Sequence, residues 1–380
     1  MKGPVYLDFN ATTPVAQEVL DAMLPFLREH YGNPSSGHEF GRLAARAVTQ
    51  AREHVAALIG AGAGEIVFTG CATEANNLAL LGVAAAAAPG HRHLVVSAVE
   101  HPAVMAPAQH LRRLGWEVTV VPVDGTGRAS VQAVADALRA DTALVSVMHA
   151  NNEVGTLQPI DEIATLTRPR GIVLHSDAAQ SAGKLALDVD SLGVDLLTLA
   201  GHKFYAPKGV GALYVRSGTR LAPVLFGAGQ ECGLRPGTEN VAAVVGLGAA
   251  AHLARHSLPQ STQALRRLRD RLHALLAGSV NGLQLNGHPE QRLPNTLHVS
   301  FPRVSGRALL QQAGDDVAAS VGSACHSEHD AVSGVLAAMG VDAARAAGAV
   351  RLSVGRPTTD DDLHRAADGL IRAWQRLASA

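Results

Sequence analysis

Short apolar runs rich in β-branched residues recur along the first two thirds of the chain, and most are separated by a stretch of helical periodicity. The runs cover residues 65–69, 93–98, 117–121, 143–148, 171–175, 194–199 and 210–215. Helical stretches between them include residues 75–88, 103–114 and 131–139. This alternation predicts an α/β fold with a mostly parallel, seven-stranded sheet wrapped by helices. Because ligands bind beyond the carboxyl ends of such strands, we expect the chemistry just after each run.

The flanking segments predict further helices and a second, smaller domain. Amphipathic helices are expected over 14–30 and 37–59, joined by the turn formers of 31–36, and over 238–256 and 262–276. Strands at 296–301 and 349–354, with helices at 333–339 and from 359 onward, predict a compact α+β unit. We place the domain change near Leu258-Pro259-Gln260, which gives a large domain of residues 14–258 and a small domain of residues 1–13 and 259–380.

Composition narrows the classes of partner. The 380 residues are 47% hydrophobic and 17% charged, with a net charge of -1, so no basic surplus indicates nucleic acid. The first residues carry no signal pattern, and the small-residue run at 83–88 is far too short to span a membrane. We expect a cytoplasmic protein with a small-molecule partner. Three distant cysteines (Cys71, Cys232 and Cys325) argue against both a disulfide framework and a zinc site, and no metal is predicted.

Lysine is rare in this chain, with four lysines against 28 arginines, yet two lie in the short stretch 200–211: Lys203 and Lys208. A lysine of lowered pKa attacks carbonyl groups to form an imine, which arginine cannot do. Asp177 follows the preceding predicted strand, 26 residues earlier. The two side chains are either a structural ion pair or the two groups that pyridoxal phosphate requires: an imine-forming lysine and a carboxylate facing the protonated ring nitrogen. Lys208 is expected to be structural.

Three further motifs follow predicted strands, and each alone has a structural interpretation. Gly70 and Thr73 open a helix, where Thr73 is expected to cap the helix and its hydroxyl to bind an anion. His101 precedes Pro102 and is either a hydrogen-bonded corner residue or a ring that stacks on a ligand. Asn152 either closes a turn or binds a ligand. Together with Lys203 and Asp177, these motifs favour a pyridoxal-phosphate site.

Two residues of the C-terminal part carry further candidate chemistry. Cys325 lies in a small, polar run with His326 beside it, which favours a reactive thiol over a buried structural cysteine. Arg351 interrupts an apolar run, so its guanidinium needs an anion, which is either a substrate carboxylate or a structural ion-pair partner.

Ordered motifs over nearly the whole chain resemble those of the cysteine desulfurase family, pyridoxal-phosphate enzymes of fold type I, in the branch with a long catalytic-cysteine loop. The matching stretches are 6–13, 32–36, 100–102, 150–156, 201–203, 235–240, 322–325 and 350–351. The resemblance implies a homodimer with a large and a small domain, the small one carrying the cysteine loop. It also implies conversion of L-cysteine to L-alanine and a Cys325 persulfide, whose sulfur passes to an acceptor protein.

The resemblance also implies individual roles. Arg351 and Asn152 hold the substrate carboxylate, Lys203 moves the Cα proton, and the Cys325 thiolate attacks the substrate sulfur. The cofactor ring is held by stacking of His101, by Asp177 at the ring nitrogen and by Gln180 at the phenolic oxygen. Its phosphate is bound by Ala72, Thr73 and His202 of the same subunit and by Thr238 of the partner subunit.

Four positions depart from the family pattern. Ala200 stands where a phosphate-binding serine is usual, Cys71 replaces glycine or serine, Cys232 replaces arginine, and residues 328–333 are unusually acidic. Cys71 and Cys232 are therefore expected to be structural. Iron–sulfur cluster assembly, tRNA thiolation and DNA phosphorothioation are the candidate destinations of the sulfur. The alternatives to a desulfurase are another pyridoxal-phosphate enzyme, such as a selenocysteine lyase, and a non-catalytic assembly scaffold.

Overall fold

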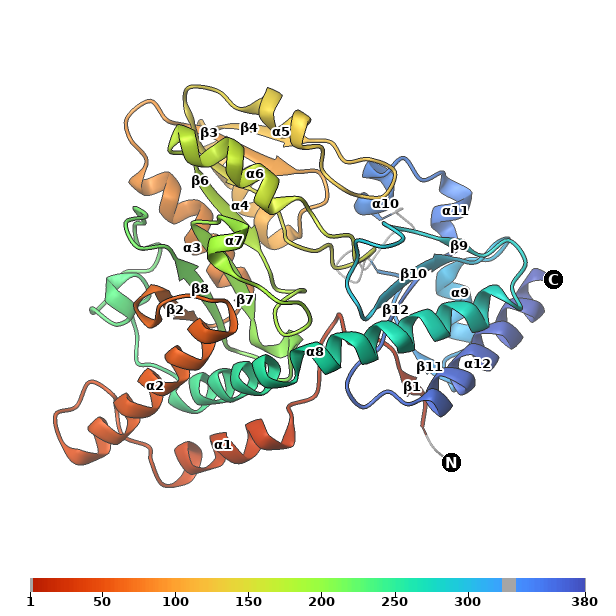
Figure 1. Cartoon of the computed structure of the whole chain (residues 1–380), viewed down its shortest axis with the longest axis horizontal. Helices are drawn as coiled ribbons and strands as arrows, with labels where there is room; N and C mark the ends of the chain where they lie inside the picture. The colour runs from red at the N-terminus through yellow and green to blue at the C-terminus, as the bar shows by residue number, and fades with distance from the viewer. Residues whose placement is uncertain (1–2, 323–332, 380) are drawn as a thin grey trace.

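A seven-stranded sheet forms the centre of the larger part of the molecule (Figure 1). The computed structural model describes residues 3–322 and 333–379. The strand order is β2-β8-β7-β6-β5-β3-β4, and only β8 runs antiparallel to its two neighbours. The strands are β2 (Ile66–Thr69), β3 (His93–Ser97), β4 (Glu117–Val121), β5 (Thr142–Ser146), β6 (Val173–Asp177), β7 (Leu196–Ala200) and β8 (Gly211–Val215). The predicted α/β fold and mostly parallel sheet are confirmed.

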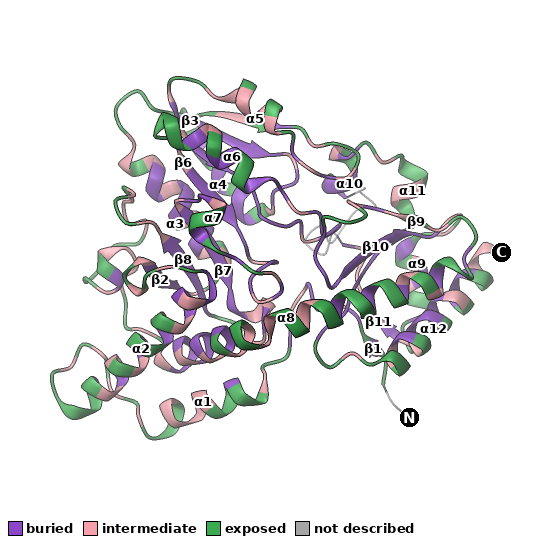
Figure 2. Cartoon of the chain, in the orientation of Figure 1, coloured by how far each residue is buried: buried purple, intermediate pink, exposed green. Residues whose placement is uncertain are grey.

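Helices cover both faces of this sheet because successive strand residues point to opposite sides. Leu94 and Leu196 pack in the core under α3 (Ala72–Ala86) and α4 (Pro102–Arg113). Their neighbours Val95 and Leu197 pack in the opposite core, which buries residues of the remaining helices. Those helices are α1 (Gln17–Arg28), α2 (Glu39–Leu58), α5 (Val131–Ala137), α6 (Ile160–Thr167) and α7 (Val189–Leu192). In Figure 2 most of the strands are accordingly buried and the outer helix faces exposed.

A second, smaller core lies beside the first and includes the N-terminal strand. Val5 and Leu7 pack against Leu352 and against Leu370 of the C-terminal helix. An antiparallel sheet of order β12-β10-β9 and a parallel pair β1-β11 frame this core. The elements are β1 (Val5–Tyr6), β9 (Gln284–Leu285), β10 (Thr296–Ser300), α9 (Gly306–Gln312), β11 (Val317–Ala318), β12 (Ala349–Ser353) and α12 (Asp360–Ala378). The short helices α10 (Gly334–Ala338) and α11 (Ala343–Ala347) pack in a separate small cluster with Val99 and Met148.

One helix, α8 (Val241–Ala277), runs along both cores. The sequence predicted two helices with a break at residues 258–260, and that break is wrong: Pro259 lies inside the helix. Pro259 is exposed, and leucines before and after it (Leu247, Leu268 and Leu272) are buried in the two cores, which offsets the lost backbone hydrogen bond. The division into two domains at residue 258 stays a prediction. By length and composition α8 is the one described helix that could cross a membrane, but its apolar residues lie in the cores.

Candidate active site

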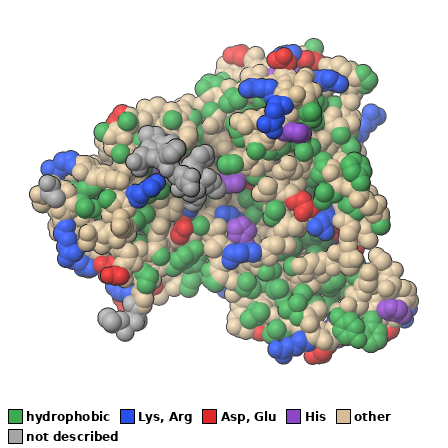
Figure 3. All heavy atoms as spheres, turned by 180° about the vertical axis from the view of Figure 1, so that it is seen from behind, with side chains coloured by type: hydrophobic (Ala, Val, Ile, Leu, Met, Phe, Trp, Pro, Cys, Tyr) green, Lys and Arg blue, Asp and Glu red, His purple; other side chains and the backbone are tan. Residues whose placement is uncertain are grey.

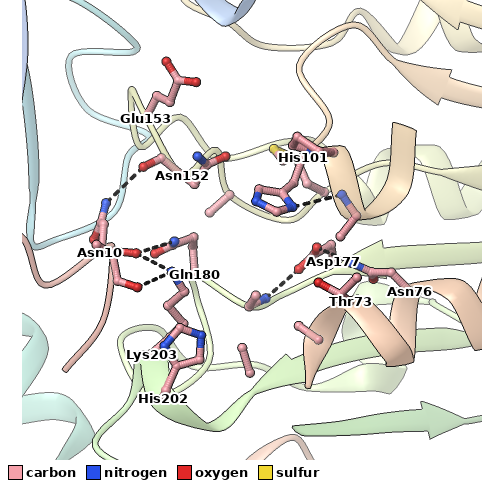
Figure 4. A pocket seen from close by; sticks show the side chains of 18 of the residues that line it. Asn10, Thr73, Asn76, His101, Asn152, Glu153, Asp177, Gln180, His202 and Lys203 are labelled. Carbon is pink, nitrogen blue, oxygen red and sulfur yellow. Dashed lines mark hydrogen bonds between the residues drawn. The ribbon is translucent and has the colours of Figure 1, made fainter. Parts of the chain in front are cut away.

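A cavity of about 350 Å³ opens at the carboxyl ends of the sheet strands, within the size range of small-molecule sites. Its lining comes from both ends of the chain as well as from the sheet. Figure 4 shows side chains from the N-terminal segment, from α3 and from the loops after β5, β6 and β7 turned toward one another. The predicted residues in the lining are Ala72, Thr73, His101, Asn152, Asp177, Gln180, His202, Lys203 and Arg351.

Lys203 ends a short 3-10 turn that follows β7 directly. Its Nζ donates hydrogen bonds to two backbone carbonyls of the N-terminal segment, Asn10 O at 2.6 Å and Ala11 O at 2.8 Å (Figure 4). The amine therefore lies where two segments 190 residues apart converge. Sequence reasoning placed Lys203 at the site and did not find these carbonyl partners.

Asp177 is the last residue of β6, whereas the sequence predicted that this strand ends two residues earlier, at His175. Asp177 is almost fully buried. One carboxylate oxygen accepts from Nδ2 of Asn76 at 2.7 Å, and the other accepts from the backbone N–H of Ala179 at 2.9 Å. Asn76 is on α3 and fully buried, and its Oδ1 has no partner among the described residues. Two donors thus hold the carboxylate in place at the floor of the cavity.

His101 is both a corner residue and a cavity residue. It caps α4 through Nδ1, which accepts from the backbone N–H of Ala103 at 3.1 Å. Burial, with the nearby charge of Lys203, lowers the pKa of His101, and Asp177 opposes that shift. The ring is therefore neutral at pH 7, and because Nδ1 accepts a hydrogen bond the proton is on Nε2.

His202 precedes Lys203 and also faces the cavity. Its Nδ1 lies 3.2 Å from the hydroxyl of Thr12. Burial and the neighbouring lysines lower the pKa of His202 to about 4, so the ring is neutral at physiological pH. It can then act on an anionic group as a hydrogen-bond donor rather than as a charge.

The turn at the start of α3 differs from the prediction in one respect. Cys71, not Thr73, is the N-cap: its Sγ accepts from the backbone N–H of Glu74 at 3.5 Å. Because α3 begins at Ala72, Thr73 lies in the first helical turn, where backbone N–H groups have no intrahelical acceptor. The prediction that Thr73 caps the helix is wrong, but its place in the cavity lining is as expected. Cys71 also lines the cavity, so its structural role stays a prediction.

Arg351 is on β12 and its guanidinium is almost fully buried. It donates to Oδ1 of Asp8 at 2.7 Å and to the backbone carbonyl of Asn152 at 3.0 Å. Its Nε has no partner in the part of the chain that the structure describes. A buried guanidinium with a donor to spare, at the edge of a cavity, is suited to binding a carboxylate.

Two predicted site residues are not in the cavity lining. Thr238 lies on an exposed loop, and in a single chain it does not reach the cavity. Cys325 lies outside the described residues, between Gly322, which lines the cavity, and Ser333, whose hydroxyl donates to Glu153 of the lining at 2.5 Å.

Sequence reasoning missed several residues that the fold brings to the site. Asn10, Asn76 and Glu153 line the cavity, and Lys184 lies directly behind it against Gln180. Only Lys184 had a usable signal, because the rarity of lysine that singled out Lys203 applies to it equally. The others are ordinary polar residues whose partners are far away in the sequence.

The chemistry of these groups fits pyridoxal phosphate. The fixed carboxylate of Asp177 suits a protonated ring nitrogen, the amine of Lys203 suits the aldehyde, and the N–H groups at the start of α3 suit the phosphate. Gly211 closes this side of the site: a Cβ there would lie 2.7 Å from Leu199 O and 2.9 Å from the carbonyl carbon of Cys71. Strand β8 therefore approaches the turn at the start of α3 more closely than a residue with a side chain would permit.

Comparisons with known proteins give the family of the chain. The Aminotransferase class-V family matches residues 5–365. The chain is 44% identical over 378 residues to "Cysteine desulfurase IscS" of Dictyoglomus turgidum, covering 99% of this chain and 96% of that protein. A solved NifS-like protein superposes with a TM-score of 0.92 at 37% identity, over 98% of this chain and 100% of that one. DndA from Streptomyces lividans superposes with a TM-score of 0.78 at 40% identity, over 90% and 97% of the two chains.

Proposed function

The chain belongs to the aminotransferase class-V family and is a pyridoxal-phosphate-dependent cysteine desulfurase, and we propose that Lys203, Asp177, His101 and Arg351 carry its chemistry while Cys325 receives the sulfur. The convergence of these four described residues on one cavity is the observation that carries the proposal. When bound, pyridoxal phosphate supplies an aldehyde that combines with amines and a protonated ring that takes up electrons from the substrate.

Substrate binding depends on Arg351. Its guanidinium, whose Nε is unpartnered among the described residues, donates hydrogen bonds to the carboxylate of L-cysteine. The side chain of Asn152 lies beside it in the cavity lining. Asp8 holds the guanidinium from the far side, so the substrate meets a preoriented donor.

Proton movement depends on Lys203 and His101. Lys203 takes the proton from the substrate Cα and returns a proton to Cα when L-alanine forms, while Asn10 O and Ala11 O fix its resting position. His101 is neutral and keeps its proton on Nε2, so it can pack flat against an aromatic ring and donate to a developing anion. Asp177 stays in place because Asn76 and Ala179 donate to it.

Sulfur transfer depends on Cys325. Its thiolate attacks the substrate sulfur, the substrate C–S bond breaks, and the electron pair of that bond stays on carbon, which a proton then converts to the methyl group of L-alanine. The Cys325 persulfide keeps the sulfur for an acceptor protein. No external oxidant or reductant is needed, because L-cysteine and the thiol give L-alanine and the persulfide.

The test is the Cys325→Ala variant with L-cysteine. We expect the visible spectrum of the bound cofactor to change on addition of L-cysteine as it does in the wild type, while alanine production is lost. Cys232→Ser is the matched control, since Cys232 is exposed and outside the cavity lining, and it should keep full alanine production. Sustained alanine formation by Cys325→Ala would contradict the role of Cys325. Trapping the persulfide with candidate acceptors separates iron–sulfur assembly, tRNA thiolation and DNA phosphorothioation as destinations.

We also propose that the enzyme is a homodimer in which Thr238 completes the phosphate site of the partner subunit. Large apolar side chains are exposed at Tyr31, Phe40 and Phe226, and Figure 3 shows hydrophobic side chains at the end of the α1–α2 lobe. Patches of this kind mark interaction surfaces. Light scattering should give twice the mass of the chain, and Thr238→Val should weaken cofactor retention. A monomer that retains the cofactor would refute this.

We further propose that the enzyme acts in the cytoplasm and that it contacts no nucleic acid directly; the balanced charge supports the second proposal. In a filter-binding assay, we expect the enzyme to retain neither DNA nor RNA on the filter, at low salt as well as at high salt.

A further inference from the structure

Lys184 is a buried lysine that the reaction described above does not use. It lies in the turn after β6, four residues beyond Gln180, and is 6% exposed. Thr262 of α8 donates its hydroxyl hydrogen to the Lys184 backbone carbonyl at 2.8 Å, which fixes the base of the side chain. Burying an ammonium costs several kcal/mol unless it gains strong partners, so the position calls for an explanation.

Both acceptors of the Lys184 ammonium among the described residues belong to Gln180. Nζ lies 3.0 Å from the Gln180 backbone carbonyl and 3.2 Å from its side-chain Oε1. A purely structural buried lysine is expected to pair with a carboxylate, and none approaches within ion-pair distance in the part of the chain that the structure describes. The Lys184 ammonium therefore contacts, and orients, the neutral side-chain amide of Gln180.

That orientation is fixed by donor and acceptor chemistry. An ammonium only donates, so Oε1 must face Lys184 and the NH2 group must face the other way. Nε2 accordingly donates to Asn10 O at 3.0 Å (Figure 4). If the Gln180 amide were flipped, its NH2 group would face the Lys184 ammonium, and its Oε1 would face the backbone carbonyl of Asn10. The remaining N–H of this amide has no acceptor among the described residues, and Gln180 lines the cavity.

The same carbonyl joins this arrangement to the reactive lysine. Asn10 O accepts from Gln180 Nε2 and, at 2.6 Å, from Nζ of Lys203. Lys184, Gln180, Asn10 O and Lys203 thus form one hydrogen-bonded chain. The same groups are coupled electrostatically: burial, then the charges of Lys203 and Arg351, lower the pKa of Lys184 to about 7, and below that pH Lys184 is an ammonium that can only donate.

We propose that Lys184 is a positioning residue of the cofactor site, which acts through Gln180 by locking its side-chain amide with the NH2 group toward Asn10 O and the cavity. The cofactor-facing N–H would then meet the oxygen substituent of the ring. The proposal rests on the proposed function only in placing pyridoxal phosphate beside Gln180, and it does not depend on Cys325 or on sulfur transfer.

The test is a pH titration of the visible absorption of the holoenzyme without substrate, in wild type, Lys184→Met, Gln180→Leu and the double variant. A donor to the ring oxygen favours the deprotonated chromophore, so Lys184→Met should raise the titration midpoint by about 1 pH unit. If Lys184 acts through Gln180, the double variant should shift no further than Gln180→Leu alone. Additive shifts, or a Lys184→Met midpoint equal to that of wild type, would overturn the proposal.

Two controls keep the result interpretable. Lys208→Met removes an exposed lysine five residues beyond Lys203 and should leave the midpoint unchanged. Lys184→Arg keeps a donor-only cation and should restore the wild-type midpoint to within about 0.3 pH unit, because a guanidinium locks the amide in the same sense. If Lys184→Met does not retain the cofactor, Lys184→Gln takes its place, since it also lacks the ammonium. Running the series in the Cys325→Ala background separates failure of this proposal from failure of the desulfurase mechanism.

Discussion

Arg52 on α2 holds the loop before Thr238 against the sheet, and its removal is the sharpest stability test. Its guanidinium donates to both carboxylate oxygens of Glu231, at 2.8 and 2.6 Å, and to the backbone carbonyl of Ile66. It also lies 4.6 Å from the ring centroid of Phe68. The Glu231 side chain is only 3% exposed, and Arg52 is its one cationic partner in the described part of the chain.

The expected magnitude follows from that burial. After Arg52→Ala, the backbone N–H of Phe68, at 2.7 Å, is the one hydrogen-bond donor to the Glu231 carboxylate that remains among the described residues. Removing one partner of a buried ion pair costs about 3–5 kcal/mol, because the other charge is left without compensation. Arg267→Ala is the matched control. Arg267 makes two hydrogen bonds to Asp360, but these side chains are 61% and 49% exposed, and such a pair contributes about 1 kcal/mol or less.

The assay is urea unfolding of the holoenzyme at pH 7, at one protein and one cofactor concentration, since both add to the apparent stability. We expect the free energy of unfolding to fall several times more for Arg52→Ala than for Arg267→Ala. Replacing Arg52 and Glu231 together by methionine should recover most of the loss. Equal effects of the two arginine variants would refute the reasoning, because water would then be reaching the Glu231 carboxylate.

Three further predictions concern the site and the core. Gly211→Ala should displace the turn at the start of α3 and weaken pyridoxal phosphate binding at least tenfold in equilibrium dialysis, whereas Gly64→Ala, with no atom within 4 Å of its Cβ, should not. Arg351→Met should raise the KM for L-cysteine by about tenfold or more while the spectrum of the resting enzyme stays the same; an unchanged KM would contradict its role. Burial lowers the pKa of His175 to about 3, so this ring stays neutral in the native state while it takes up a proton in the unfolded chain below about pH 6.5. Stability is therefore lost as pH falls, and between pH 6.5 and 4.5 the wild type should lose about 2 kcal/mol more than His175→Gln; parallel pH curves for the two proteins would refute this.

The sheet and the residues at its strand ends could be predicted from the amino-acid sequence alone. Short apolar runs rich in β-branched residues placed all seven strands to within a few residues, because a strand buried on both faces is apolar along its whole length. Lys203, Asp177 and His101 could be found because parallel strands end at a common edge, so residues that follow successive strands must meet there.

The surroundings of those residues come from segments that meet only in the folded chain. The carbonyls of Asn10 and Ala11 reach Lys203 from a segment about 190 residues away, and a backbone carbonyl leaves no trace in the side-chain pattern. The break predicted at Pro259 failed for a related reason: local propensity opposes a helix there, but packing against two cores outweighs it. The role of Lys184 could not be predicted from the sequence either. Its rarity was visible in the sequence, yet its purpose depends on the direction in which the buried amide of Gln180 points.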